Sequence, residues 1–279
     1  MPGTAAGVPF SVLLPVYGGD DARHLRESFR SVTTDQELRP HEVVVVRDGP
    51  VGPALSTALE ELRAGSEIPV VLVELEENQG LAAALEAGLE ACTHEIVARQ
   101  DADDVSRPRR FAVQVPLVAG GLDIVGSAIE EFEDDAADGG LVRVPPLSTD
   151  EIERAARFRS PFNHPSVVYR RSAVRVAGGY EDLPLMEDYW LFARMLVAGA
   201  RALNVAEPLV LYRIGAGAYS RRGGHRLLRS EIELQRRLHE IGFTTTTQRL
   251  RNDILRGGYR LVPERLRRGA YRADARRRE

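Results

Sequence analysis

The chain has 279 residues, a net charge of −4 at neutral pH and 43% hydrophobic residues, which is the composition of a globular protein. It contains no run of 18 apolar residues and no signal-peptide pattern, so we expect a cytoplasmic protein. The single cysteine, Cys92, excludes an internal disulfide and a cysteine-bound metal cluster, and the absence of lysine excludes P-loop and Schiff-base chemistry.

The charge is unevenly distributed along the chain. Residues 1–220 carry 20 Arg against 34 Asp and Glu, a net charge of −14, whereas residues 221–279 carry 17 Arg against 7 acids, a net charge of +10. We therefore expect a basic, mainly helical extension after residue 220. One interpretation is that it meets phosphates or an anionic membrane face, and the other is that it is a solvated helical surface.

The first hundred residues alternate between apolar strands and helices. A helix capped by Asp20 or Asp21 follows the first strand. This alternation predicts a mostly parallel sheet with helices on both faces, because parallel strands need crossover connections. The predicted strands are 10–16, 42–46, 70–75 and 95–99, and the later helices are 53–62 and 81–92.

The second half of the chain has a more irregular pattern. An amphipathic segment at 111–117 precedes a strand at 123–132, and Ser148 with Glu151 forms a capping box for a helix that reaches residue 158. The remaining predicted elements are a strand at 166–169, helices at 172–177 and 187–198, and two short strands at 202–205 and 209–212.

Three carboxylates, Asp101, Asp103 and Asp104, directly follow the fourth strand. Carboxylates this close together repel each other unless a counter-charge is present. A divalent cation such as Mg²⁺ or Mn²⁺ supplies one and shares its other positions with substrate phosphates. The alternative is an acidic turn that caps the next helix.

Ligands of such sheets bind beyond the carboxyl ends of the strands. Neither a Gly-x-Gly-x-x-Gly nor a P-loop sequence follows the first strand, so ordinary dinucleotide and P-loop sites are not expected. Carboxylates at the carboxyl ends of the strands can instead accept hydrogen bonds from the base and the ribose of a nucleotide, whose diphosphate would be bound through a metal ion. The features at the four ends are Pro15-Val16-Tyr17, Asp48-Gly49, Asn78-x-Gly80 and Asp101-x-Asp103-Asp104.

These motifs continue in register through the second half of the chain, over about residues 8–225. Together they resemble the family 2 inverting glycosyltransferases with the GT-A fold, in particular the amylovoran-type exopolysaccharide and capsule branch. The resemblance implies a GT-A domain over residues 1–220, with a nucleotide-binding half (about 8–110) and an acceptor half (about 111–220). The later motifs are Asn163-His164-Pro165-Ser166, Gly178-Gly179-Tyr180 and Glu187-Asp188-Tyr189.

The resemblance also implies the substrates. The donor is a nucleotide-diphosphate sugar, with UDP favoured, and a divalent metal (Mn²⁺ or Mg²⁺) bridges its diphosphate to Asp101 and Asp103. The acceptor is a hydroxyl of a glycan or of a lipid-linked sugar. For a lipid-linked acceptor, the basic extension is a candidate for contact with the inner face of the membrane. Nucleic acid is not an expected partner. The residues implied in nucleotide-sugar binding are Pro15, Val16, Tyr17, Asp48 (base), Asn78, Gly80, Arg99 and Asp101.

Asp188 is implied as the general base. Inverting transfer is a single displacement that needs a base on the acceptor hydroxyl and charge stabilisation on the departing diphosphate. The alternative is that Glu187 and Asp188 only cap their helix. Trp190 is either a core residue or a ring on which a sugar stacks. His164 is either a turn histidine whose ring nitrogens are hydrogen-bonded within the protein or, together with Asn163, a contact to the donor or the acceptor.

Two differences from the family pattern stand out. Many relatives carry a His after the Tyr-Arg pair of the last strand, whereas Ile214 and Gly215 follow Tyr212-Arg213 here, so His225 is a candidate replacement. Gln100 replaces a common Met, which we take as a packing detail. Two other functions remain open: a sugar-1-phosphate nucleotidyltransferase, which would need a basic Gly-rich loop after the first strand, and a non-catalytic sugar-nucleotide-binding protein.

Overall fold

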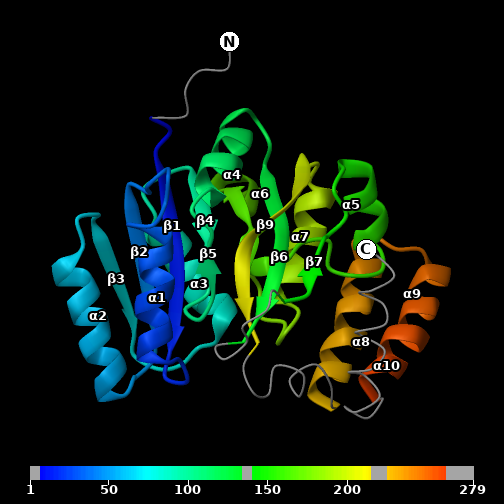
Figure 1. The fold of residues 1–279 in the computed structure, drawn as a ribbon. Coiled ribbons are helices and arrows are strands. Elements are labelled where there is room, and N and C mark those ends of the chain that lie inside the picture. The colour runs from blue at the N-terminus through cyan, green and yellow to red at the C-terminus, as the bar shows by residue number, and fades with distance from the viewer. Residues whose placement is uncertain (1–6, 134–139, 215–224, 262–279) are drawn as a thin grey trace.

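The computed structural model describes residues 7–133, 140–214 and 225–261 (Figure 1). The strands are β1 (Phe10–Tyr17), β2 (Glu42–Asp48), β3 (Val70–Leu75), β4 (Ile96–Arg99), β5 (Val105–Ser106), β6 (Ile124–Phe132), β7 (Val142–Arg143), β8 (Val168–Arg170) and β9 (Ala202–Arg213). The helices are α1 (Ala22–Val32), α2 (Pro53–Gly65), α3 (Leu81–Ala91), α4 (Arg110–Ala119), α5 (Thr149–Ala156), α6 (Arg171–Val176), α7 (Glu187–Val197), α8 (His225–Glu240), α9 (Thr246–Asn252) and α10 (Gly258–Leu261). A 3₁₀ turn, η1 (His164–Ser166), and a π-helix, η3 (Asp253–Gly257), complete the elements.

One mixed sheet runs through the described part of the chain in the order β3-β2-β1-β4-β8-β6-β9-β5, with β7 paired to β6. The first four strands are mutually parallel, and β8 is antiparallel to both β4 and β6. The strand order reverses between β1 and β4, and such a switch point is where open α/β sheets bind ligands. The predicted fold class, a mostly parallel sheet with helices on both faces, is confirmed.

Alternate residues of the buried strands supply two hydrophobic cores, one on each face of the sheet. Leu13 and Val44 pack under α3, α6 and α7, whereas Val12 and Val45 pack under α1, α2 and α4. Both faces are therefore covered, as near-continuous apolar strands require. Figure 1 shows α1 and α2 together on one side of β1 and β2.

The last strand differs from the sequence prediction. Residues 202–205 and 209–212 do not form two strands but belong to one strand, β9, which runs beside β6. The register jumps where Ala128 pairs with Pro208 after Ser127 has paired with Val205, so Ala206 and Glu207 bulge out of the ladder. The bulge takes up Ala206 and Glu207 directly before Pro208, which lacks a backbone N–H, without ending the strand.

The basic extension begins with α8, which packs on α7. Leu234 and Leu238 join Tyr189 and Trp190 in a third hydrophobic cluster. Figure 1 shows α8, α9 and α10 together beside α7. None of the helices within residues 7–133, 140–214 and 225–261 is long and apolar enough to cross a membrane.

Candidate active site

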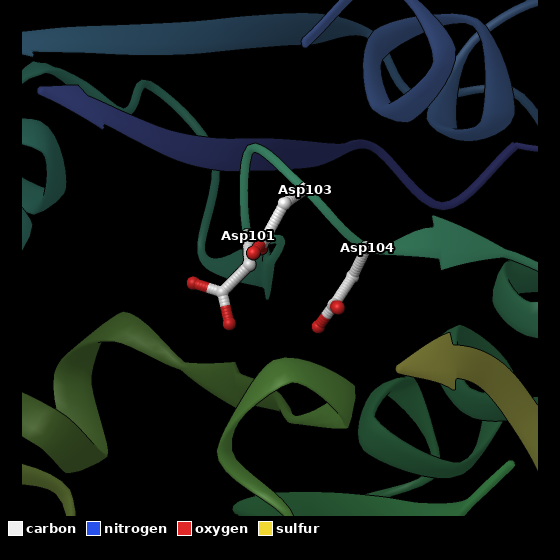
Figure 2. A group of neighbouring side chains, drawn as sticks. All are labelled: Asp101, Asp103 and Asp104. Atoms are coloured by element: carbon white, nitrogen blue, oxygen red, sulfur yellow. The ribbon is translucent and has the colours of Figure 1, made fainter. Parts of the chain in front are cut away.

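The acidic loop between β4 and β5 gathers three carboxylates. Asp101, Asp103 and Asp104 each offer one carboxylate oxygen within 4.8 Å of the others. Figure 2 shows the carboxylates of Asp101 and Asp104 pointing to the same side of the loop. Burial raises the pKa of Asp103 and raises that of Asp104 further, and the neighbouring carboxylates add to both shifts. Unpaired charges at this spacing favour a bound cation.

Arg99 neutralises one of these carboxylates directly. Its guanidinium is almost fully buried and donates to both carboxylate oxygens of Asp101, with 2.6 Å between Nη1 and Oδ2. A bidentate pair of this kind fixes the orientation of the carboxylate as well as its charge. Arg99 therefore holds Asp101 in place at the end of β4, and the negative charge left for a cation lies mainly on Asp103 and Asp104.

Asp104 ties the acidic loop to the end of β9. Its Oδ1 accepts the backbone N–H of Arg213 at 2.9 Å, while the Arg213 side chain donates to the Asp103 carbonyl (2.7 Å) and to Glu27 (2.6 Å). The other carboxylate oxygen of Asp104 is buried and accepts no hydrogen bond from any residue that the structure describes. An unpartnered buried carboxylate oxygen is costly, and a cation would satisfy it.

A buried polar network beneath the loop corrects our interpretation of Gln100 as a packing detail. Gln100 donates to the Asp104 carbonyl (2.8 Å) and to Ser28 (2.9 Å), and it accepts from Arg110 at 2.6 Å. Arg110 also donates to the carbonyl of Arg99 at 2.6 Å. Burial, with a smaller contribution from Arg99, lowers the pKa of Arg110 to about 9. The network fixes the backbone of the acidic loop from below.

The turn after β1 adds a fourth carboxylate near the loop. Asp21 caps α1, accepting the N–H groups of Arg23 and His24, so Asp20 is not the cap. Asp20 instead accepts the N–H of Tyr17 at 2.9 Å. Burial raises the pKa of Asp20 to about 7, and Asp103 and Asp101 lie close enough to raise it as well. The sequence showed Asp20 only as an alternative helix cap, so its place beside the acidic loop was missed.

The nucleotide-contact residues predicted on β1 lie next to this loop at the switch point. Tyr17 is about half exposed, and its ring lies against Gly19, where an added Cβ would meet the ring at 2.6 Å. Pro15 is buried within the β1–β2 ladder, and the side chain of Val16 belongs to the core on the α1 side. Of the three residues, only Tyr17 thus presents a largely accessible side chain.

Asp48 at the end of β2 organises the start of α3. Its two carboxylate oxygens accept the N–H groups of Gln79 (2.7 Å) and Gly80 (3.0 Å), and the Asn78 side chain donates to the Asp48 carbonyl at 3.3 Å. Gly80 has φ +91°, a conformation that L side chains rarely adopt, while an added Cβ there would meet open space. The structure therefore brings the predicted residues Asp48, Asn78 and Gly80 together where β2 ends and α3 begins.

The predicted base lies at the first turn of α7. Burial raises the pKa of Asp188, which the backbone N–H of Tyr189 and the guanidinium of Arg99 partly offset, and Asp101 is close enough to raise it further. Burial and Asp188 together raise the pKa of Glu187 to about 7. The structure therefore brings the base candidate, Arg99 and the acidic loop together, although 84 or more residues separate them in the sequence.

His164 and Asn163 take different places. The Nε2 of His164 lies 2.9 Å from the Tyr180 hydroxyl, and burial, with Arg99 nearby, lowers the pKa of His164 well below its usual range, so the ring is neutral at physiological pH. Asn163 accepts from Arg143 (3.1 Å) and donates to the Ser127 carbonyl (2.9 Å). His164 is thus oriented beside Arg99, whereas Asn163 joins the β6–β7 hairpin to η1.

Trp190 packs between α7 and α8. It is only 5% exposed, its ring lies under the guanidinium of Arg194, and its indole N–H donates to Glu181 at 2.8 Å. These contacts are those of a core residue with a satisfied polar atom. The side chain of His225, the candidate replacement for the family histidine, lies outside the described part of the chain.

A hard divalent cation fits the acidic loop. The donor set consists of carboxylate oxygens, the type of ligand that Mg²⁺ and Mn²⁺ prefer. The buried Oδ2 of Asp104 lacks a hydrogen-bond donor within the residues that the structure describes, and the charge of Asp103 has no bidentate guanidinium partner like that of Asp101. Asp103 and Asp104 would be the main ligands, with Asp101 held beside them by Arg99.

The chain belongs to glycosyl transferase family 2, whose model matches residues 11–177. It is 36% identical to the amylovoran biosynthesis glycosyltransferase AmsE of Erwinia amylovora, over 95% of this chain and 98% of that protein. It is 34% identical to an Escherichia coli enzyme named UDP-Gal:alpha-D-GlcNAc-diphosphoundecaprenol beta-1,3-galactosyltransferase, over 96% and 97%. The protein is therefore a glycosyltransferase that uses nucleotide sugars, as the sequence motifs predict.

A solved structure supports the fold. The mannosyltransferase PcManGT of Pyrobaculum calidifontis, determined with GDP-Man and Mn²⁺, aligns with 98% of this chain and 77% of its own, with a TM-score of 0.66 and 18% identity. At this identity the likeness shows the fold alone. The expected GT-A fold is thus confirmed independently of the sequence motifs.

Proposed function

We propose that the protein transfers a sugar from a nucleoside-diphosphate sugar to an acceptor hydroxyl with inversion, by a metal-assisted single displacement. The observation that carries this proposal is the position of Arg99, which pairs with Asp101 in the acidic loop and is close enough to Asp188 to limit the rise in its pKa that burial causes. The proposed metal-binding loop and the proposed base are therefore both close to one buried guanidinium.

Asp188 acts as the general base in this proposal. Its burial raises the pKa and makes the carboxylate a stronger base than an exposed aspartate, and Arg99 nearby limits this rise. The acceptor hydroxyl gives its proton to Asp188 as its oxygen attacks the anomeric carbon and the bond to the diphosphate breaks. No protein nucleophile is required.

The acidic loop serves the leaving group. A divalent cation, Mn²⁺ or Mg²⁺, held by Asp103 and Asp104 beside Asp101 would supply positive charge for the departing diphosphate. The Asp104–Arg213 hydrogen bond and the Gln100 network keep the loop fixed before the donor binds, so little reorganisation is needed during the reaction.

The nucleotide is proposed to bind along the ends of β1 and β2. Tyr17 offers an accessible ring for the base, and Asp48 with the Asn78–Gly80 turn lies at the neighbouring strand end. Asp48 keeps acceptor capacity for a base N–H because each of its oxygens receives only one hydrogen bond in the structure. UDP is the favoured nucleotide, since the E. coli relative is named for UDP-Gal.

The acceptor is proposed to be a lipid-linked sugar, the acceptor class in the name of the same E. coli relative. Such an acceptor requires the enzyme to work at the inner face of a membrane, with the basic extension as the contacting part. The neutral His164 and the half-buried Glu187 lie beside Asp188 and Arg99 and are the proposed contacts to the sugars.

The test is a panel of nucleotide sugars incubated with Mn²⁺ and an acceptor that carries a diphosphate-linked sugar. Release of nucleoside diphosphate that depends on the acceptor supports the transferase, and the anomeric configuration of the product, measured by NMR, decides inversion. A non-catalytic binding protein would bind the donor without turnover, and a nucleotidyltransferase would release pyrophosphate from a sugar phosphate and a nucleoside triphosphate.

A further inference from the structure

The end of the described chain forms a helical segment with an unusual distribution of side chains. α9 leads without a break into the π-helix η3 and then into α10. Leu250, Ile254 and Leu255 of this segment are 57%, 71% and 56% exposed. Large apolar side chains this exposed and this close together are uncommon on a globular surface and mark contact sites.

The opposite side of the same segment is firmly packed. Arg256 pairs through two hydrogen bonds, of 2.6 and 3.0 Å, with Glu231 of α8, which is fully buried. An added Cβ on Gly257 would lie 3.3 Å from Leu228. The wide π turn brings Arg256 and Gly257 together onto the α8 side. Leu250, Ile254 and Leu255 are therefore exposed on a segment whose opposite side packs on α8.

The helices that carry and support the three apolar residues are basic. Residues 225–261 carry eight Arg against four Asp and Glu, a net charge of +4. Arg226, Arg229 and Arg251 are exposed. The acid of η3, Asp253, lies 3.7 Å from Arg249, which offsets its charge.

We infer that Leu250, Ile254 and Leu255 form a membrane-docking surface that inserts into the interface of an anionic lipid bilayer, with the surrounding arginines on the lipid headgroups. Apolar side chains on a rigid amphipathic helix with cationic neighbours are what such an interface binds. Each arginine near an anionic surface contributes about 1 kcal/mol, an amount that salt reduces. The inference stands on this surface and does not depend on the proposed reaction.

The experiment measures co-sedimentation of the full chain with vesicles of phosphatidylglycerol and phosphatidylcholine, and with vesicles of phosphatidylcholine alone. The chain is expected to pellet with the anionic vesicles, less so at high salt. The double variant Ile254→Ser, Leu255→Ser should bind about tenfold or more weakly, because two apolar side chains no longer enter the interface. The matched control is Val176→Ser on α6, at a 75% exposed valine outside the surface, which should bind like the original chain.

Four results would overturn the inference. The first is binding of the double variant at the strength of the original chain. The second is no binding of the original chain to anionic vesicles at low salt. The third is a dimer by light scattering that the double variant turns into a monomer, which would assign the surface to a second copy. The fourth is a lower melting temperature of the double variant with vesicle binding intact, which would mean that another part of the chain covers the surface. Nucleoside-diphosphate binding should stay unchanged in all variants, which separates this outcome from a failure of the proposed function.

Discussion

Arg99 donates two hydrogen bonds to the carboxylate of Asp101, so the first aspartate of the acidic loop already has a counter-charge before any metal binds. The three carboxylates are therefore not equivalent. Asp101 is oriented by the protein, and Asp104 is anchored by the backbone of Arg213 at one oxygen only. Asp103 is the one of the three that carries neither a bidentate arginine pair like that of Asp101 nor a hydrogen bond from Arg213 N like that of Asp104 among the described residues.

This difference predicts the effect of removing one charge. Asp103→Asn should abolish the Mn²⁺-dependent part of nucleoside-diphosphate binding, because the neutral amide is a weaker ligand for a divalent cation than the carboxylate. Isothermal titration with and without Mn²⁺ measures it. Asp150→Asn, at an exposed aspartate on α5, is the control. Unchanged Mn²⁺-dependent affinity in Asp103→Asn would refute the metal assignment.

The base assignment predicts a separation of kinetic parameters. Asp188→Asn should lower kcat roughly 10²-fold or more and leave donor affinity nearly unchanged, because the lost interaction is made only as the acceptor proton moves. Because burial raises the pKa of Asp188, the acid limb of the pH–rate profile should lie above the ordinary aspartate range. Near-native turnover of the variant would assign the base elsewhere, with His164 as the next candidate.

The raised pKa of Glu187 predicts that the stability of the fold depends on pH. The pKa of Glu187 is raised from 4.5 to about 7 in the folded chain. Between these pH values the carboxyl of Glu187 keeps its proton in the folded chain and has lost it in the unfolded chain. The contribution of Glu187 to the free energy of unfolding is therefore fully present below about pH 4.5 and is lost as the pH rises through about 7. Glu187→Gln should raise the melting temperature at about pH 8 relative to the original chain and leave it unchanged at about pH 4. An equal shift at both pH values would contradict the buried-acid assignment.

The basic extension should be part of the folding unit. Glu231→Gln leaves Arg256 without its buried partner and should cost about 3 kcal/mol or more in the free energy of unfolding. Glu233→Gln on the same helix removes exposed ion pairs with Arg236 and Arg237 and should cost about 1 kcal/mol or less. Chemical denaturation measures both. Equal effects of the two substitutions would mean that the buried pair does not stabilise the fold.

The sequence by itself determined the fold class and the identity of the acidic loop. The apolar runs of β1 to β4 alternate with amphipathic helices, and this local pattern is sufficient because parallel strands require crossover helices. Three carboxylates directly after β4, at Asp101, Asp103 and Asp104, then predict a site at the sheet edge, with a helix-capping turn as the alternative. What these features share is that their evidence lies within a few neighbouring residues.

Only the tertiary structure decided which residues surround each carboxylate. The pairing of Asp104 with the backbone of Arg213 joins residues 109 positions apart, and Asp20 lies by the loop although the sequence shows it only as a possible cap. Gln100 is a loop-organising residue because Ser28 and Arg110 reach it from two other elements. These contacts depend on how helices pack on the sheet, and a linear pattern does not contain that packing. The same holds for the outward Ile254, whose exposure is set by the ion pair that Arg256, on the opposite side of the helix, makes with α8.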